Sequence, residues 1–170
     1  MEKFMKPGVG GIIEKDIEGV PCILVQERCK EDAPTETGLL EIPAGKIREF
    51  ENIYDCLRRE IMEETGLTIV KIEGEEDALV FEGEEYRVLS YEPFSSSQNI
   101  AGNYPIMVQV FICSVQGKLA KITNETRHLR WLDLKELEKL LEESPLSFYP
   151  MHVNTLKKYL RHRRGMLQAK

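Results

Sequence analysis

The hydrophobic and polar positions at the start of the chain follow the pattern expected of β-strands. Residues 8–14 and 20–28 are rich in aliphatic and β-branched side chains, and a polar turn at residues 15–19 lies between them, so we expect an antiparallel hairpin. Similar patterns predict further strands at residues 39–42, 67–72, 78–82, 86–91, 106–115 and 129–132, with a turn and a short strand within residues 117–123.

A helical period begins at residue 53. Ile53, Leu57 and Ile61 recur every four residues, which places them on one face of a helix. Asn52 is the expected N-cap, and Gly66 lies where a left-handed residue would end the helix. We therefore predict a central helix that packs against the core through this apolar face.

Two more helices are predicted near the end of the chain. Asp133 and Glu136 resemble a capping box, and Pro145 ends the element that follows. The apolar face of this helix is expected to contain Leu134, Leu137, Leu140 and Leu141. A last helix is expected to begin near Pro150, with inward-facing Val153, Leu156, Tyr159 and Leu160. This order of elements predicts an α/β protein with a mixed sheet flanked by helices.

Composition agrees with one globular domain over residues 1–170. The chain is 42% hydrophobic and 31% charged, which is typical of a soluble protein with a core and not of a disordered one. Its formal net charge of −6 argues against general affinity for nucleic acid or for anionic membranes. An anionic substrate would therefore need a metal ion or a local basic patch.

The cysteines and the apolar runs bear on location. Cys22, Cys29, Cys56 and Cys113 show no Cys-x-x-Cys spacing, so we expect free thiols in a reducing compartment. No apolar run approaches the length of a membrane span, and the first residues lack the apolar segment of a signal peptide. We expect a cytoplasmic protein.

Acidic residues gather on one edge of the central helix. Glu60, Glu63 and Glu64 share a face, and three like charges there are best held together by a cation. Hard oxygen ligands favour Mg²⁺ or Mn²⁺. Arg59 is placed to pair with one of these carboxylates. A structural cation site and a plain solvated face are the alternatives that the residues alone leave open.

The whole string around these residues resembles the Nudix box at every fixed position. The box runs from Gly45 to Leu67: Gly45, five residues, Glu51, seven residues, Arg59-Glu60, an aliphatic and any residue, Glu63-Glu64, any residue, Gly66 and an aliphatic residue. The resemblance implies an α/β/α sandwich. It also implies hydrolysis of a nucleoside diphosphate linked to another moiety, with a divalent cation.

The resemblance also implies roles for individual residues. Glu60, Glu63, Glu64 and the carbonyl of Gly45 would bind the metal, with Arg59 beside them, and Glu51 would hold Arg59 or reach a metal-bound water. In some members the glutamate matching Glu60 or Glu64 contributes to catalysis directly, Glu60 as the general base; in others a glutamate from a downstream loop is the base, for which Glu125 is our candidate. Glu125 as a surface residue is the alternative.

The substrate-binding candidates lie outside the box. Arg28 is a candidate for a substrate phosphate, or else a solvated strand end. The connection at residues 92–105 contains Asn103 and other polar side chains suited to a ribose or base, or else it is a flexible connection. Glu41 opens a Glu-x-Pro-Ala-Gly segment that resembles ADP-ribose and other nucleotide-sugar pyrophosphatases, although the Ser-Pro-Gly segment common in that group is absent.

Several functions remain open on this reading. We expect an ADP-ribose-like small-molecule substrate, no nucleic-acid or membrane partner, and a fold that permits a homodimer. A nucleoside triphosphate pyrophosphohydrolase and a non-catalytic nucleotide sensor are the alternatives. The basic residues 161–164 could recognise phosphate or RNA, or simply complement the end of the last helix. His128, His152 and His162 are not spaced as a metal site, so we assign none of them to the mechanism.

Overall fold

The structure is a computed structural model that describes residues 2, 4–29, 34–120 and 126–168. The strands are β1 (Lys6–Ile17), β2 (Val20–Arg28), β3 (Leu40–Glu41), β4 (Ala44–Lys46), β5 (Thr68–Ile72), β6 (Leu79–Glu82), β7 (Arg87–Ser90), β8 (Ser95–Gln98), β9 (Ile106–Gln116) and β10 (Thr126–Asp133). The helices are α1 (Ile53–Thr65), α2 (Leu134–Glu143) and α3 (Pro150–Gln168), with short 3₁₀ turns η1 (Pro34–Glu36), η2 (Glu75–Asp77) and η3 (Pro145–Ser147).

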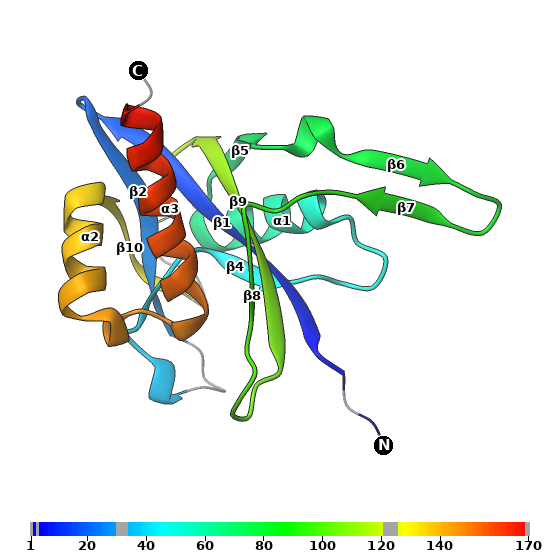
Figure 1. The fold of residues 1–170 in the computed structure, drawn as a ribbon, viewed down its shortest axis with the longest axis horizontal. Coiled ribbons are helices and arrows are strands. Elements are labelled where there is room, and N and C mark those ends of the chain that lie inside the picture. Colours follow the sequence, from blue (N-terminus) through cyan, green and yellow to red (C-terminus); the bar gives the residue numbers. More distant parts are fainter. Residues whose placement is uncertain (1, 3, 30–33, 121–125, 169–170) are drawn as a thin grey trace.

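The main sheet is mixed, as expected. Its central order is β10-β2-β1-β9-β5, while β3, β4 and β8 pair with β2, β1 and β9. β1 runs parallel to β9, and its pairings with β2 and β4 are antiparallel. β1 is therefore the strand that joins the early hairpin to the later half of the sheet (Figure 1).

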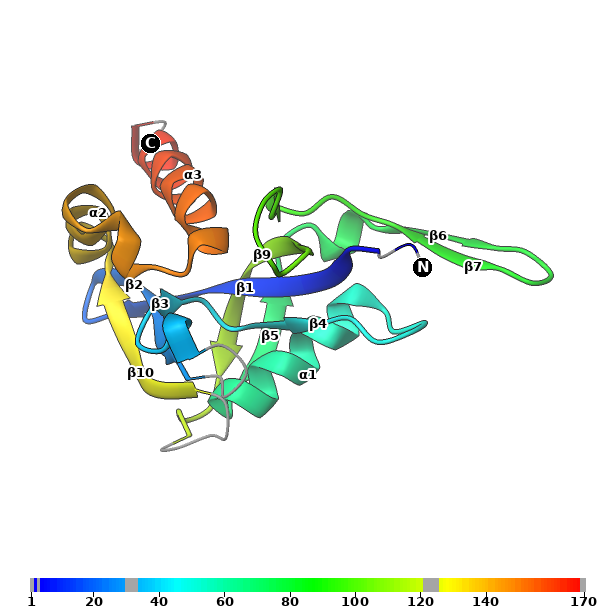
Figure 2. The same cartoon turned by 90° about the horizontal axis from the view of Figure 1, so that it is seen from below.

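Helices cover both faces of this sheet, so the predicted α/β/α sandwich is confirmed. α1 packs on one face with Ile53, Leu57 and Ile61 buried, while α2 and α3 lie together on the other face (Figures 1 and 2). At Gly11 a Cβ atom would lie only 2.7 Å from Cδ1 of Ile61. Glycine at this position lets α1 approach β1 closely.

The predicted apolar faces and caps of the helices are also confirmed. Leu137, Leu141, Leu156 and Tyr159 are buried in the second core cluster. The side chain of Asn52 accepts a hydrogen bond of 2.9 Å from the backbone N–H of Tyr54, and Gly66 ends α1 with a φ of 73°. Asp133 accepts from the backbone N–H groups of Lys135 and Glu136, each at 2.9 Å.

Three strand predictions need correction. The connection expected at residues 92–105 contains β8, which pairs antiparallel with β9. Hydrogen bonds between the hydroxyl of Thr155 on α3 and those of Ser95 and Ser97, at 3.0 and 3.2 Å, fix β8 to α3. The described residues 117–120 form no strand, because their backbone instead caps α1, with Ala120 N–H donating to the carbonyl of Thr65. β10 begins at Thr126, inside the loop expected at residues 124–128, and carries an irregularity in its pairing before Arg130.

The basic end of α3 is engaged within the fold. Arg163 pairs with Glu14 and Glu73, and Arg164 pairs with Glu138. Burial of Tyr159 and its hydrogen bond to Glu14 raise the pKa of the Tyr159 hydroxyl. These contacts favour the structural interpretation of this segment over phosphate or RNA recognition.

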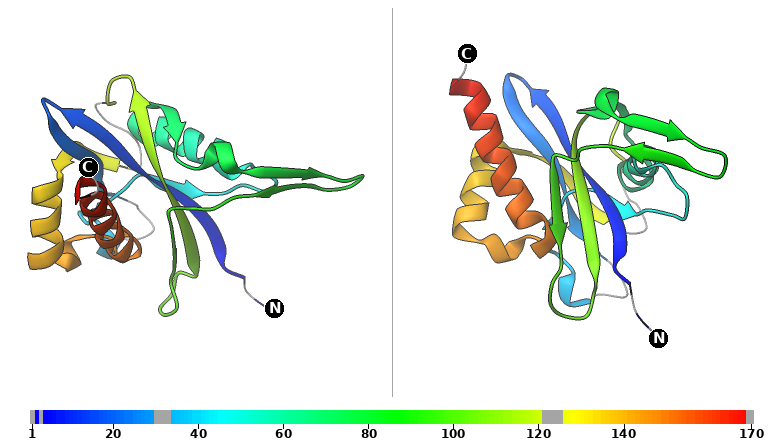
Figure 3. Two further views of the ribbon diagram at one scale, coloured as in Figure 1. Left: turned by 45° about the horizontal axis from the view of Figure 1, so that its top comes forward. Right: turned by 45° about the vertical axis from the view of Figure 1, so that its right-hand side comes forward.

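The hairpin of β6 and β7 stands away from the rest of the molecule. Figure 3 shows it projecting from the body beyond α1. Leu79 and Phe81 on β6 and Tyr86 and Val88 on or beside β7 are exposed large apolar residues. An isolated two-stranded ribbon buries little apolar surface, so within the described residues this strand pair is the one least stabilised by packing.

The cysteines are free, as predicted, and Cys22, Cys56 and Cys113 are buried. Within the described residues, no helix combines the length and the apolar character needed to cross a membrane.

Candidate functional site

A pocket of about 740 Å³ lies beside the N-terminal end of β9, β4 and one side of α1. It brings together residues from the box and from segments far away in the sequence. The polar and aromatic lining residues are Arg28, Glu41, Lys46, Arg48, Arg59, Glu60, Glu63, Tyr104, Tyr149 and His152, and Gly45 also lies in the wall.

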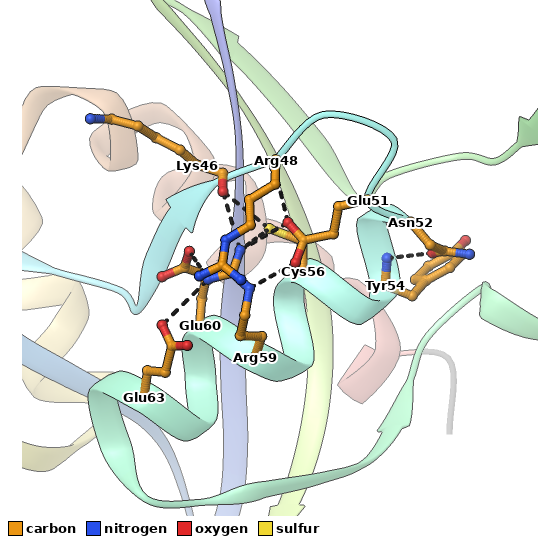
Figure 4. Close-up of polar contacts among 9 residues, drawn as sticks. All are labelled: Lys46, Arg48, Glu51, Asn52, Tyr54, Cys56, Arg59, Glu60 and Glu63. Carbon is orange, nitrogen blue, oxygen red and sulfur yellow. Dashed lines mark hydrogen bonds and ion pairs between the residues drawn. The ribbon is translucent and has the colours of Figure 1, made fainter.

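Arg59 organises the acidic side of this pocket (Figure 4). Its Nε and Nη2 atoms donate to the two carboxylate oxygens of Glu51 at 2.7 and 2.9 Å. Its Nη1 donates to Glu60 at 2.6 Å and to Glu63 at 3.3 Å. The carboxylates also raise the pKa of the guanidinium further above its usual range. The expected pairing of Arg59 with a helix carboxylate is therefore present with Glu60 and Glu63, and Glu51 holds the opposite side of the guanidinium.

Glu51 is strongly favoured in its charged form. The hydrogen bonds from Arg59 lower its pKa to about 2, although its partial burial opposes this, and the backbone N–H of Arg48 adds a further bond of 3.0 Å. Beside it, burial and the Glu51 carboxylate raise the pKa of the Cys56 thiol to about 12. The thiol of Cys56 donates to the carbonyl of Lys46 at 3.4 Å, so Cys56 packs the box loop against the helix.

The three box glutamates are held by different partners. Glu60 and Glu63 contact Arg59 and line the pocket, whereas Glu64 is buried and is not among the pocket-lining residues. Its Oε2 accepts from Gln26 Nε2 and from the backbone N–H of Ala44, both at 3.0 Å. Helical spacing placed the three residues on one edge of α1, as predicted, and Arg59 and Gln26 hold their carboxylates.

Gly45 is the point at which the box loop meets the helix carboxylates. A Cβ atom on Gly45 would lie 1.9 Å from the carboxyl carbon of Glu60, so any other residue here would force the Glu60 carboxylate to move. Gly45 follows Ala44, whose N–H binds Glu64. The loop thus contacts both Glu60 and Glu64.

The donor set suits a hard divalent cation. Within the described residues, no three His, Cys, Asp or Glu side chains already converge on one point as a metal site. However, Glu60 and Glu63 offer carboxylate oxygens at the pocket wall, and Gly45 leaves room for the Glu60 carboxylate against the loop backbone. Such oxygen donors fit Mg²⁺, Mn²⁺ or Ca²⁺ better than soft metals.

Arg28 is not a solvated strand end. It is buried in the pocket wall, where its Nε donates to Glu36 at 2.6 Å and its Nη1 to Glu41 at 2.9 Å. Its guanidinium carbon also lies 4.1 Å from the ring centroid of Tyr149. Two carboxylates and one aromatic face therefore hold Arg28 rigidly, and Glu41 is brought into the same wall.

The predicted contact Asn103 falls outside the set of pocket-lining residues. Asn103 is exposed in the connection between β8 and β9, and the next residue, Tyr104, lines the pocket instead. The Nζ atoms of Lys6 and Lys46 lie 4.9 and 5.7 Å from the Tyr104 ring centroid. Glu125 lies outside the described residues.

Sequence reasoning missed His152, Tyr149 and Gln26. His152 is buried in the pocket wall, and its Nδ1 accepts from the backbone N–H of Ile42 at 3.3 Å, which assigns the ring proton to Nε2. Gln26 belongs to β2, Tyr149 directly precedes α3 and His152 lies in its first turn, so no local spacing connects them with the box. A glutamine inside an otherwise aliphatic strand was the one available signal at Gln26.

The fold and the site define a class: an α/β sandwich whose central helix and adjoining loop place carboxylates in a pocket suited to a cation and an anionic ligand. The NUDIX domain profile matches residues 5–151 of this chain. The chain therefore belongs to the NUDIX family.

Individual proteins resemble this chain in sequence or in fold. A curated relative, mRNA-decapping enzyme subunit 2 of Saccharomyces cerevisiae, is 26% identical over 133 residues, covering 76% of this chain but 12% of its own length. The NUDIX domain of Shewanella oneidensis NrtR, solved with ADP ribose, has a TM-score of 0.66 at 14% identity and covers 95% of this chain and 90% of its own. The Escherichia coli ORF135 protein has a TM-score of 0.63 at 23% identity, covering 94% and 91%.

Proposed function

We propose that this protein is a divalent-metal-dependent Nudix pyrophosphohydrolase, which cleaves the pyrophosphate linkage of a nucleoside diphosphate bound to another moiety. The observation that carries this proposal is the arrangement around Arg59, because one guanidinium holds Glu60 and Glu63 at the pocket wall next to Gly45. Family membership supports the reaction class.

In this proposal the residues of the site form two sides, one that binds the cation and one that binds the rest of the substrate. Glu60, Glu63, Glu64 and the Gly45 carbonyl would hold the cation, for which Mg²⁺ or Mn²⁺ is our choice. A bound divalent cation neutralises phosphate charge and lowers the pKa of water. Arg59 and Glu51 orient the carboxylates, and Glu60, which lines the pocket, is the candidate general base within the described residues.

The opposite side is positioned to hold the rest of the substrate. Lys46 and Arg48 line the pocket near the box loop and supply the local positive charge that an anionic substrate needs in a chain of net charge −6. Tyr104 and Tyr149 offer aromatic surface, and the Arg28–Glu41 pair offers fixed polar groups. An ADP-ribose-like nucleotide sugar fits this combination of a charged centre and an aromatic, polar flank.

The direct test is a panel of substrates with Mg²⁺ and with Mn²⁺, with products separated by chromatography. The proposal expects AMP and a sugar phosphate from ADP-ribose. Pyrophosphate released from a triphosphate would instead establish the alternative triphosphate pyrophosphohydrolase. Because a curated relative is a decapping enzyme, a capped oligonucleotide belongs in the panel. Nucleotide binding without turnover in saturating Mg²⁺ would favour a sensor.

Glutamate-to-glutamine variants test the proposed metal ligands. Glu63→Gln should lower kcat by at least about a hundredfold with little change in unfolding free energy, because Glu63 is largely exposed and surface substitutions usually cost about 0.5 kcal/mol or less. Glu64→Gln should lose turnover too. In this variant the amide oxygen of the new glutamine can still accept the hydrogen bond from the backbone N–H of Ala44, so the buried position keeps one of its contacts. Wild-type turnover in Glu63→Gln would remove it from the metal site.

A cytoplasmic location and the ability to form a homodimer remain expectations. The free cysteines support the first.

A further inference from the structure

Three buried polar side chains from three different elements meet at the pocket wall. Gln26 on β2 has no exposed surface, Glu41 on β3 is 3% exposed, and Glu64 on α1 is 4% exposed. Two carboxylates this deep are costly unless donors satisfy them, because burial removes the water that would stabilise their charge. The groups that donate hydrogen bonds to these two carboxylates are therefore needed to keep them charged and in place.

Gln26 donates to both carboxylates. Its Nε2 lies 3.0 Å from Oε2 of Glu64 and 3.4 Å from Oε1 of Glu41. Both neighbours are acceptors, which assigns the amide nitrogen to this side, and its two hydrogens match the two partners. Gln26 therefore links a glutamate of the box to the glutamate that pairs with Arg28 in the substrate side of the pocket.

We propose that Gln26 is a positioning residue, which orients Glu64 for the cation and ties it to the Arg28–Glu41 pair. This inference rests on the proposed function and adds one residue to it that lies outside the box. Glu64 is fixed from two directions, by Gln26 and by the backbone N–H of Ala44. Removing one donor leaves the carboxylate free to rotate away from the position it needs.

A neutral amide is the group that suits this position. Lysine or arginine would place a full positive charge against Glu64 and compete with the cation for its oxygen atoms. A glutamate would bring a third carboxylate into the same buried space. An apolar side chain would fill the volume but donate nothing. Residues that orient metal ligands in this way typically contribute about 10–100-fold to metal affinity or activity.

The test is Gln26→Met, which keeps approximate length and removes the donor. The matched control is Gln109→Met, at a half-buried glutamine on β9 that does not line the pocket. Mn²⁺ binding to the substrate-free protein is measured by electron paramagnetic resonance, alongside the metal activation constant, KM and kcat. Gln26→Met should weaken Mn²⁺ binding by about 10–100-fold and raise KM, while Gln109→Met should match the wild type.

The outcomes separate the two proposals. If wild-type protein binds Mn²⁺ and turns over a nucleotide but folded Gln26→Met binds Mn²⁺ within twofold of wild type, the role of Gln26 is overturned and the proposed function stands. If the wild type neither binds Mn²⁺ nor hydrolyses any nucleotide in the panel, both are overturned. Should Gln26→Met fail to fold, Gln26→Asn replaces it. Its shorter amide does not span the 3.0 Å contact, and the same loss of Mn²⁺ affinity is expected.

Discussion

Arg59 shows how a single residue can set the charge pattern of a site. Its guanidinium contacts the carboxylates of Glu51, Glu60 and Glu63 and also the carbonyl of Lys46. Bidentate pairs such as that of Arg59 with Glu51 are stronger and more directional than single hydrogen bonds. The acidic side of the pocket therefore depends on Glu51, which itself lies outside the pocket-lining set.

The first residue-scale prediction concerns Glu51→Gln. With a folded pKa of about 2 against an ordinary value of 4.5, the Glu51 carboxylate contributes its full stabilisation above pH 4.5 and loses it as the pH falls toward 2. The variant should be less stable by about 1.5–3 kcal/mol at pH 7. Urea unfolding from pH 7 to pH 3 should show this difference shrinking below pH 4.5. A difference that stays constant with pH would contradict the assignment.

The second residue-scale prediction concerns Phe50, the residue before Glu51. It is 99% exposed and has a φ of 58°, a left-handed conformation that costs roughly 1 kcal/mol for a bulky residue. Asparagine tolerates this conformation, and no buried contact would be lost. Phe50→Asn should therefore raise the free energy of unfolding by up to about 1 kcal/mol in chemical denaturation. A clear loss of stability would mean that the ring has packing partners in solution.

At the scale of the element, α1 combines an anchoring face with the acidic edge. Leu57→Ala removes a fully buried side chain and should cost about 2–5 kcal/mol in thermal or chemical unfolding. Met62→Ala, on the exposed side of the same helix, is the control and should cost less than about 1 kcal/mol. Equal losses in the two variants would refute the assignment of faces.

The elements also show what sequence patterns can and cannot predict. α1 was predicted closely because its period, N-cap and terminal glycine all agree, and each is a local signal. β8 was missed because its Ser95–Gln98 segment has no apolar alternation; pairing with β9 and contacts from Thr155 make it a strand. Likewise, helical spacing located the box glutamates, but not the directions of their carboxylates, which distant side chains decide.

Gln26, Glu41 and Glu64 illustrate the same limit for the site. They are separated by 15 and more residues along the chain and meet only because β2, β3 and α1 converge. Arg28 was identified as a candidate, but its burial between Glu36 and Tyr149 depends on η1 and on the start of α3. Tertiary contacts of this kind leave no periodic trace in the sequence.

At the scale of the whole molecule, stability is unevenly distributed. The β6–β7 hairpin extends away from the body (Figure 3), and its apolar residues Leu79 and Phe81 are exposed, whereas β9 is buried along most of its length. We predict that backbone amides in β6 and β7 exchange with deuterium at least about a hundredfold faster than those in β9. Equal protection would show that the hairpin is covered in solution.

The parallel pairing of β1 with β9 has a consequence for how the chain is made. Lys6 lies opposite Ile106, so the first strand must wait for about a hundred further residues before its central partner leaves the ribosome. Until then one edge of the nascent β1–β2 hairpin has no neighbour, and closing so long a loop slows assembly. This interval is the stage of biosynthesis at which a chaperone would have most to protect.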